Sequence, residues 1–320
     1  MADDQAPAEP VAVEHPLAAL EGRKPAAPDW FQWALAQPIE RTRIAVGGAG
    51  IELLAWGERG RPGLLLVHGN TAHADWWSFM APFIAADYRV AAISLSGMGG
   101  SDWRNHYSPD VFAQEMRAGA EAAGLHDAQV APIYVGHSFG GSQVFYTAQT
   151  HPDWMRAAIM VDTNFGVGIP PAVTEGFKDP HLRTQPNRVY PTLAEALARF
   201  RFSPPQGYPN PYIIDYIARA SLKAVRKEGG GEGWTWRFDP FFWSKFDRSV
   251  AEAALTKPRA RPMVHIVGAD SEIPKRAEEI GGDRLPKVPR VVIPNAEHHI
   301  MADQPLALVA AIRALLAVWP

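Results

Sequence analysis

The chain has 320 residues, of which 47% are hydrophobic and 20% charged, as expected for a globular protein. The 31 basic and 34 acidic residues are mixed along the chain, which gives no sign of a nucleic-acid or membrane partner. There is no cysteine, so disulfides, thiolate catalysis and cysteine-based metal sites are excluded. The N-terminus lacks the pattern of a signal peptide, and the apolar stretch Leu306–Trp319 is too short to span a bilayer. We therefore expect a soluble cytoplasmic protein.

The first 40 residues are rich in alanine, proline and charge, which predicts a tail or an arm draped over the fold. Trp30, Phe31 and Trp33 predict that the last part of this arm packs against something. Beyond it, Arg41–Val46 and Ile51–Trp56 flank a glycine-rich turn and predict a β-hairpin.

Short apolar runs then alternate with helical patterns. The expected strands are Leu64–Val67, Arg89–Leu95, Ile133–Val135, Ala157–Val161, Met263–Val267 and Arg290–Ile293. The expected helices are Asp75–Ala86, Pro109–Ala123, Ser138–Thr150 and Pro305–Val318. This alternation predicts the α/β class, with a mostly parallel, eight-stranded sheet and helices on both faces. We expect residues 41–165 and 256–320 to form this core.

The alternation stops in residues 166–255, which predicts an inserted, mainly helical cap. Helical patterns cover Leu193–Arg201 and Tyr212–Lys227, and a triple glycine follows them. The segment is rich in aromatic residues, of which we expect a minority to face a substrate pocket: Phe177, Phe202, Tyr208, Tyr212, Trp234, Trp236, Phe241, Phe242 and Trp243.

The pentapeptide Gly136–Gly140 has the pattern Gly-x-Ser-x-Gly between an expected strand and an expected helix. In that context the pattern is typical of a nucleophile elbow, a sharp turn that exposes the hydroxyl of its serine, here Ser138. The flanking glycines make room for the turn, since a Cβ at either position would crowd the neighbouring backbone. Ser138 is therefore the candidate nucleophile.

A serine nucleophile needs a base, and histidine suits this role at neutral pH. His298 follows the last expected strand, in the chain-order position of the histidine in a Ser–Asp–His triad, with His299 as its rival. The preferred acid is Asp270, which follows the strand Met263–Val267. Two alternatives stay open, Asp162 after an earlier strand and Glu272 two residues further on.

Two backbone N–H groups are expected to form an oxyanion hole, those of Phe139 and Asn70. The side chain of Asn70 is a further possible donor. His73, close after the oxyanion loop, and Trp234, in the cap, are candidates for substrate contact. The histidines and carboxylates form no metal-ligand pattern, so we expect neither a metal nor another cofactor.

Taken together, the chain resembles the α/β-hydrolase superfamily. The segments that carry the resemblance are Leu66–Asn70, Gly97–Ser101, Gly136–Gly140, Val267–Asp270 and His298–Pro305. The family pattern favours His298 over His299, because Asp303 and Pro305 follow His298 at the family's spacing. The gap from Gly268 to Asp270 is one residue shorter than usual, and a minority of related enzymes place the acid where Asp162 stands.

The resemblance implies a serine hydrolase that cleaves a carboxylic ester or lactone of an apolar or aromatic small molecule through an acyl-enzyme. Epoxide hydrolases and haloalkane dehalogenases of this fold use aspartate at the elbow, which Ser138 argues against. Carbon–carbon bond hydrolases, amidases, acyltransferases and perhydrolases share the serine triad and stay open. A small-ligand receptor on this fold is the alternative that is not an enzyme. The oligomeric state is not predicted.

Overall fold

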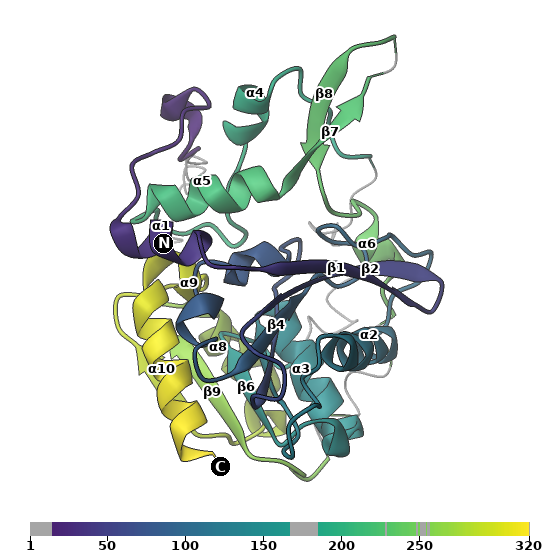
Figure 1. The fold of residues 1–320 in the computed structure, drawn as a ribbon, viewed down its shortest axis with the longest axis vertical. Coiled ribbons are helices and arrows are strands. Elements are labelled where there is room, and N and C mark those ends of the chain that lie inside the picture. Colours follow the sequence, from purple (N-terminus) through teal and green to yellow (C-terminus); the bar gives the residue numbers. More distant parts are fainter. Residues whose placement is uncertain are drawn as a thin grey trace, which may run out of the picture.

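The computed structural model describes residues 15–166, 185–227, 229–247, 249, 254 and 257–319. Its centre is an eight-stranded sheet with the strand order β1-β2-β4-β3-β5-β6-β9-β10 (Figure 1). The strands are β1 (Glu40–Val46), β2 (Ala49–Trp56), β3 (Gly63–Val67), β4 (Arg89–Ile93), β5 (Ile133–His137), β6 (Ala157–Val161), β9 (Met263–Gly268) and β10 (Arg290–Ile293). The hairpin β1–β2 is antiparallel and lies at one edge, β2 pairs antiparallel with β4, and the other six strands of the sheet run parallel to one another. The expected α/β sheet is confirmed.

The central strands are apolar throughout because both of their faces are covered. Every residue of β3 is buried, and its side chains alternate between two cores. Leu64 and Leu66 belong to one cluster, and Leu65 and Val67 belong to the other. Burying each leucine contributes roughly 1.5–3 kcal/mol to stability.

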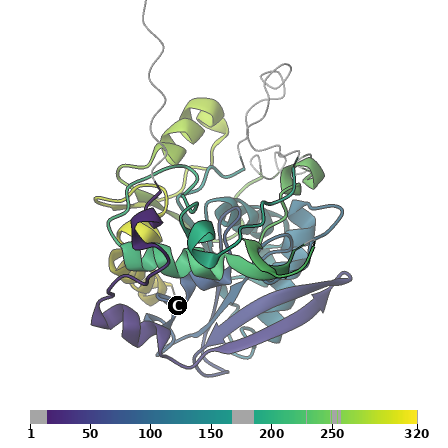
Figure 2. The ribbon, with the colours of Figure 1, turned by 90° about the horizontal axis from the view of Figure 1, so that it is seen from above.

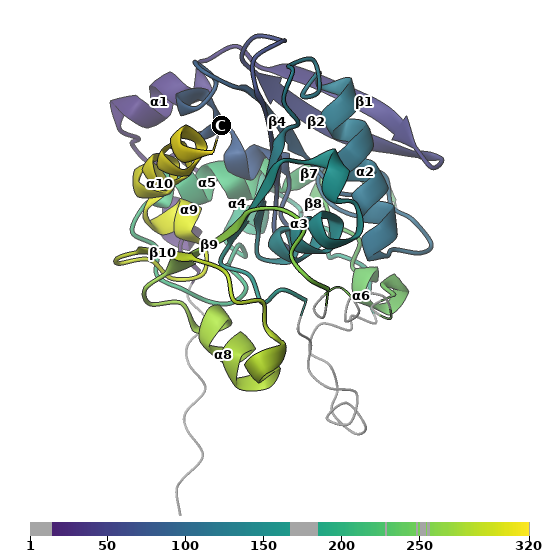
Figure 3. The ribbon, with the colours of Figure 1, turned by 90° about the horizontal axis from the view of Figure 1, so that it is seen from below.

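Helices from distant parts of the sequence cover the two faces (Figure 3). One face carries α2 (Pro109–Ala122) and α3 (Phe139–Thr150), whose buried side chains join the second cluster. The other carries α10 (Pro305–Val318), with α1 (Asp29–Leu35) nearby, and their side chains join the first cluster. The short helices α8 (Glu272–Gly281) and α9 (Ile300–Asp303) follow β9 and β10. Among the described helices, none combines the length and apolarity needed to cross a bilayer.

The helix expected at Asp75–Ala86 is replaced by two short 3-10 turns, η2 (Ala74–Trp77) and η3 (Ala81–Phe83). Pro82 lies in the second turn. It has no N–H to donate to an α-helix, and in an α-helix its ring would clash with the backbone of the preceding turn. Trp76 and Trp77 are both buried, and this loop thereby carries large apolar side chains beside the end of β3.

The inserted segment contains α4 (Leu193–Leu197), α5 (Pro211–Ala220), α6 (Phe242–Lys245) and a hairpin of β7 (Leu222–Arg226) and β8 (Glu232–Trp236). The expected helix Tyr212–Lys227 therefore ends early, and its second half is a strand. Gly229, Gly230 and Gly231 all have positive φ, a conformation that glycine adopts readily, and this turn lets β7 pair with β8. Seen from above, these green elements lie across the blue and teal core (Figure 2).

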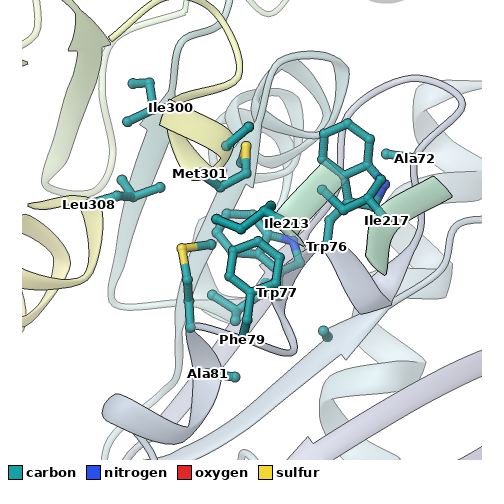
Figure 4. Close-up of a cluster of buried hydrophobic side chains, with 14 of the residues drawn as sticks. Ala72, Trp76, Trp77, Phe79, Ala81, Ile213, Ile217, Ile300, Met301 and Leu308 are labelled. Atoms are coloured by element: carbon teal, nitrogen blue, oxygen red, sulfur yellow. The ribbon is translucent and has the colours of Figure 1, made fainter. Parts of the chain in front are cut away.

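Apolar side chains pack the inserted segment and the N-terminal arm against the core. The described residues within 185–247 of the inserted segment are called the cap below. Ile213 and Ile217 of α5 meet the tryptophans after β3 and the side chains of α9 (Figure 4). Phe31 of α1 is buried with its ring 5.0 Å from Tyr212. Residues 1–14 lie outside the described part, as does Phe177. The division of the chain at residues 165 and 256 stays a prediction, because residues 167–184, 250–253, 255 and 256 also lie outside it.

Candidate active site

Ser138 occupies a strained turn between β5 and α3. Its backbone has φ 52° and ψ −120°, a region that non-glycine residues rarely adopt and that costs on the order of 1–3 kcal/mol. A Cβ on Gly136 would stand 2.4 Å from the carbonyl oxygen of Gly140, and one on Gly140 would stand 2.3 Å from that of His68. Both glycines are therefore required by close backbone approach, as the sequence predicts for an elbow.

The side chain of Ser138 is hydrogen-bonded to His298. The distance from Ser138 Oγ to His298 Nε2 is 2.9 Å, and His298 Nδ1 lies 2.8 Å from Oδ1 of Asp162. Because a carboxylate only accepts hydrogen bonds, Nδ1 carries the proton and Nε2 is left to accept the proton of the serine hydroxyl. These three side chains have the connectivity of a Ser–His–Asp triad.

Asp162 follows β6, the strand next to the elbow strand, and is fully buried. Its carboxylate also accepts a hydrogen bond from the backbone N–H of Gly268 (2.9 Å) and one from the hydroxyl of Ser271 (2.6 Å). The loop after β9 thus supplies donors to the acid. A buried charge needs such partners, since it has lost its hydration.

The structure places Asp162, and not the preferred acid Asp270, beside His298. Asp270 is exposed, and its backbone N–H binds the carbonyl of Ala296. Glu272 is also exposed and pairs with Lys275 at 2.7 Å, so it does not reach the histidine either. The loop after Gly268 is short. Its side chain at Asp270 is exposed, and the next residue, Ser271, is the one that is buried. Asp162, the sequence-based alternative, holds the position beside His298.

The loop after β3 lies directly against the elbow. A Cβ on Gly69 would come within 3.3 Å of Cβ of Ser138. His68 fixes this loop: its Nε2 accepts from the N–H of Leu95 (3.0 Å), so its Nδ1 donates to the carbonyl of Gly69 (2.6 Å). Burial lowers the pKa of His68 to about 3, which keeps the ring neutral.

Phe139 and Asn70, the expected oxyanion donors, lie on either side of this contact. Phe139 is the first residue of α3, where backbone N–H groups lack partners within the helix. Asn70 comes directly after the loop glycine, and its Oδ1 is buried without a partner among the described residues. Their role as donors to an oxyanion stays a prediction.

His299 is held away from this chemistry. Its backbone N–H and its Nδ1 both donate to Oε1 of Gln206 in the cap, at 2.7 Å and 2.5 Å. Burial keeps the pKa of His299 well below its usual value, and the neighbouring His298 and His137 act in the same direction. The preference for His298 over His299 agrees with this geometry.

A cavity of about 550 Å³ lies between the cap and the core. Asn70 and His299 line it from the core side and directly follow Gly69 and His298 in sequence, although Ser138 itself is not a lining residue. Phe242 and Trp243 line it from the cap and contact the ring of Phe139, at 5.6 Å and 5.7 Å between ring centroids. The cavity therefore ends beside the elbow.

Two expected substrate contacts do not line this cavity. His73 is buried, and its Nε2 donates to the hydroxyl of Ser221 (2.9 Å), which in turn donates to Ile217. Trp234 lies further along the hairpin, and Trp236, at the base of β8, lines the cavity in its place. The sequence places both tryptophans in the cap but does not show which of the two rings faces the cavity.

The other cap aromatics divide in the same way. Phe202 lines the cavity together with Trp236 and the two rings beside Phe139, whereas Tyr208, Tyr212 and Phe241 do not. Sequence reasoning missed Trp76, a core residue that lines the cavity, and three arginines of the cap. Over the described ranges, histidine and carboxylate side chains form no cluster that could hold a metal ion.

The fold and the arrangement of this site are typical of the α/β-hydrolase class. The model of the Alpha/beta hydrolase family matches residues 64–312, which is most of the chain. The chain therefore belongs to the Alpha/beta hydrolase family.

Curated relatives match over part of the chain. Human epoxide hydrolase 4 is 27% identical over 123 residues, which cover 38% of this chain and 33% of the relative. Lipase LipV of Mycobacterium tuberculosis is 31% identical over 33% of this chain and 39% of its own. The bifunctional esterase/perhydrolase DCH of Acinetobacter calcoaceticus is 29% identical, over 46% and 50%. The matches thus span a third to a half of each relative.

Solved structures share the fold over nearly the whole chain. A thioesterase domain from the curacin biosynthetic pathway has a TM-score of 0.68 at 21% identity, covering 87% of this chain and 100% of its own. An esterase of Mycobacterium tuberculosis has a TM-score of 0.64 at 20% identity, covering 97% and 100%. At these identities the likeness shows the fold alone.

Proposed function

We propose that the protein is a serine hydrolase that cleaves a carboxylic ester or lactone of an apolar or aromatic small molecule. The observation that carries the proposal is the hydrogen-bonded chain from Ser138 through His298 to Asp162, with the serine at a strained elbow. The names of the relatives include epoxide hydrolases and a dehalogenase as well as a lipase and an esterase. A serine rather than an aspartate at the elbow supports acyl transfer.

In this reaction Oγ of Ser138 attacks the carbonyl carbon while Nε2 of His298 takes the hydroxyl proton. The resulting imidazolium is stabilised by the buried carboxylate of Asp162, which also holds the ring in the required tautomer. His298 then gives the proton to the leaving alcohol, and an acyl-enzyme remains. Water, activated by the same histidine, attacks the acyl-enzyme and releases the acid.

The negative charge that develops on the carbonyl oxygen needs fixed donors. The N–H groups of Phe139 and Asn70 are the proposed pair, since both residues adjoin the contact between Gly69 and Ser138. The neutral ring of His68 holds the carbonyl of Gly69 and thereby the orientation of this loop. No metal or organic cofactor has a part in these steps.

The aromatic lining of the cavity supports an apolar substrate body. Phe202, Trp236, Phe242 and Trp243 come from the cap and Trp76 from the core. A volume of about 550 Å³ fits a small molecule. The cap also covers the site, which limits the access of bulk water.

The test is a panel of 4-nitrophenyl esters of increasing acyl length, together with aromatic lactones. We expect the wild type to hydrolyse at least one of them, and Ser138→Ala to lower kcat by about 10³-fold or more. Ser203→Ala, which removes a cavity-lining hydroxyl away from the elbow, is the matched control and should retain activity. Undiminished hydrolysis by folded Ser138→Ala protein would overturn the proposal.

A further inference from the structure

We propose that the cavity selects substrates that carry a carboxylate or phosphate group, which binds to Arg188, Arg199 and Arg201 at the cap side. The inference rests on the proposed function and specifies the substrate class of that site. All three arginines line the cavity, and all three are exposed, which places them at its mouth.

The first argument is the balance of charge. Among the described residues that line the cavity, the one carboxylate is Asp239. It is already engaged, because its Oδ2 lies 2.7 Å from Nζ of Lys245 and accepts a hydrogen bond from Tyr107. The positive charge of the arginines is therefore not balanced by the described residues of the cavity wall.

The second argument is that the guanidinium groups lack hydrogen-bond and ion-pair partners among the described residues. Within the described part of the chain, none of the three donates a hydrogen bond or forms an ion pair, although Arg188 lies 5.4 Å over the ring of Tyr190. Other arginines of the cap are paired: Arg219 with Asp215, and Arg237 with Glu52. Three guanidinium groups that have no partner among the described residues surround one cavity, and they offer fork-shaped donors that suit a carboxylate or a phosphate.

A neighbouring hollow of about 290 Å³ shares Arg188 and Arg199 and also contains Glu195. The hydroxyl of Thr192, the N-cap of α4, accepts a hydrogen bond from the backbone N–H of Glu195 and donates one to the Glu195 carboxylate. Glu195 therefore makes its contacts at the start of its own helix, and it forms no ion pair with Arg188 or Arg199.

The third argument is the order of side chains along the cavity. Phe200 and Phe202 are buried, and they alternate in sequence with the exposed Arg199 and Arg201. The core end of the cavity meets Asn70 beside the nucleophile. A fitting substrate has its reacting carbonyl at the core end, an apolar body along the rings and an anionic group at the arginines.

The experiment compares 4-nitrophenyl esters that differ only at the far end of the acyl chain. The mono-4-nitrophenyl esters of adipate, suberate and sebacate carry a carboxylate, their ω-amides are the neutral partners, and the ω-phosphates form a third series. We expect kcat/KM to be at least about fivefold higher for one anionic series than for its neutral partner, an advantage that salt reduces. The preferred anionic series then distinguishes carboxylate from phosphate.

The double variant Arg199→Gln/Arg201→Gln, and Arg188→Gln, should remove most of this preference and leave kcat/KM for the neutral esters within about twofold. Arg226→Gln is the matched control, since it removes the same charge from the exposed part of β7 without altering the cavity. We expect it to keep the preference.

Two failures are distinguishable. If neutral esters are hydrolysed through Ser138 and no anionic ester is preferred, the inference about the arginines is wrong and the proposed function stands. If no ester of any series is hydrolysed and Ser138 does not react with an active-site reagent, the proposed function fails, and the inference fails with it.

Discussion

At the scale of single residues, Asp162 is the most heavily constrained group of the site. It accepts hydrogen bonds from His298, Gly268 and Ser271, and its own N–H donates to Ile266 of β9 (2.8 Å). Its backbone has φ 46°, in the left-handed region. This conformation ends β6 sharply and directs the carboxylate toward the histidine, so the position is expected to tolerate few substitutions.

Asp162→Asn should lower kcat by about 10³- to 10⁴-fold, because an amide cannot stabilise the imidazolium and can favour the wrong tautomer. Asp270→Asn is the control with the same chemical change on an exposed side chain, and it should stay within about twofold of the wild type. Ester hydrolysis by the purified variants provides the measurement. A larger loss for Asp270→Asn in folded protein would restore Asp270 as the acid.

The sequence could predict Ser138 and His298 because local signals mark both. The serine lies in a glycine-flanked turn, and the histidine precedes Asp303 and Pro305 at a fixed spacing. The choice between Asp162 and Asp270 depends on which strand end points its carboxylate at the histidine. That is a tertiary relation between the ends of β6 and β9, and local spacing does not encode it.

At the scale of elements, hydrogen bonds of two polar side chains of the cap join it to the region of α9. Gln206 accepts from His299 and donates to Asp303 (2.9 Å), and Nδ2 of Asn210 donates to the backbone carbonyls of Ala302 and Asp303 (2.8 Å and 3.0 Å). Burial raises the pKa of Asp303 to about 6, with smaller contributions from Glu297 and Asp270, whereas its hydrogen bonds lower it.

This raised pKa predicts a pH dependence of stability. The folded protein retains the proton of Asp303 above pH 3.8, so this contribution to stability is present below about pH 4 and is lost as pH rises through about 6. Relative to Asp303→Asn, the free energy of unfolding of the wild type should fall by on the order of 2 kcal/mol between pH 4 and pH 7. Urea unfolding of both proteins at several pH values measures this difference. Parallel curves would contradict the assignment.

The regular elements of the core were predictable because each follows from a local pattern. Apolar runs became the central strands, and Pro109–Ala123 and Pro305–Val318 became α2 and α10. The error at Asp75–Ala86 arose where Pro82 interrupts the helical spacing, and the error at Leu222–Lys227 where the glycine turn at 229–231 favours strand pairing. The pairing of β7 with β8, in particular, depends on a turn several residues further along the chain.

At the scale of the whole molecule, burial keeps several histidines neutral. Burial lowers the pKa of His68 to about 3 and that of His265 to about 4, and it holds the pKa values of His137 and His299 well below the usual range. All four rings lie in or near the site. Protonation of any of them would leave a poorly solvated charge in the core.

The fold should therefore be sensitive to acid. For a histidine with a lowered pKa, stability is fully present above about pH 6.5 and is lost as pH falls toward the folded-state value. Between pH 7 and pH 5.5 we expect the free energy of unfolding to fall by roughly 1 kcal/mol for each of His68 and His265, and the lowered pKa values of His137 and His299 act in the same direction. Chemical denaturation at the two pH values tests this, with His106→Gln as a control at an exposed position. An unchanged free energy would contradict it.

The central claim is that Ser138, His298 and Asp162 act together as an activated nucleophile. A fluorophosphonate reacts covalently with such a serine, and peptide mass spectrometry locates the adduct without knowledge of the natural substrate. We predict a single adduct on Ser138, formed much more slowly in His298→Ala and Asp162→Asn and at the wild-type rate in Asp270→Asn. Absence of the adduct from Ser138 in folded wild-type protein, or an unchanged rate in His298→Ala, would contradict the claim.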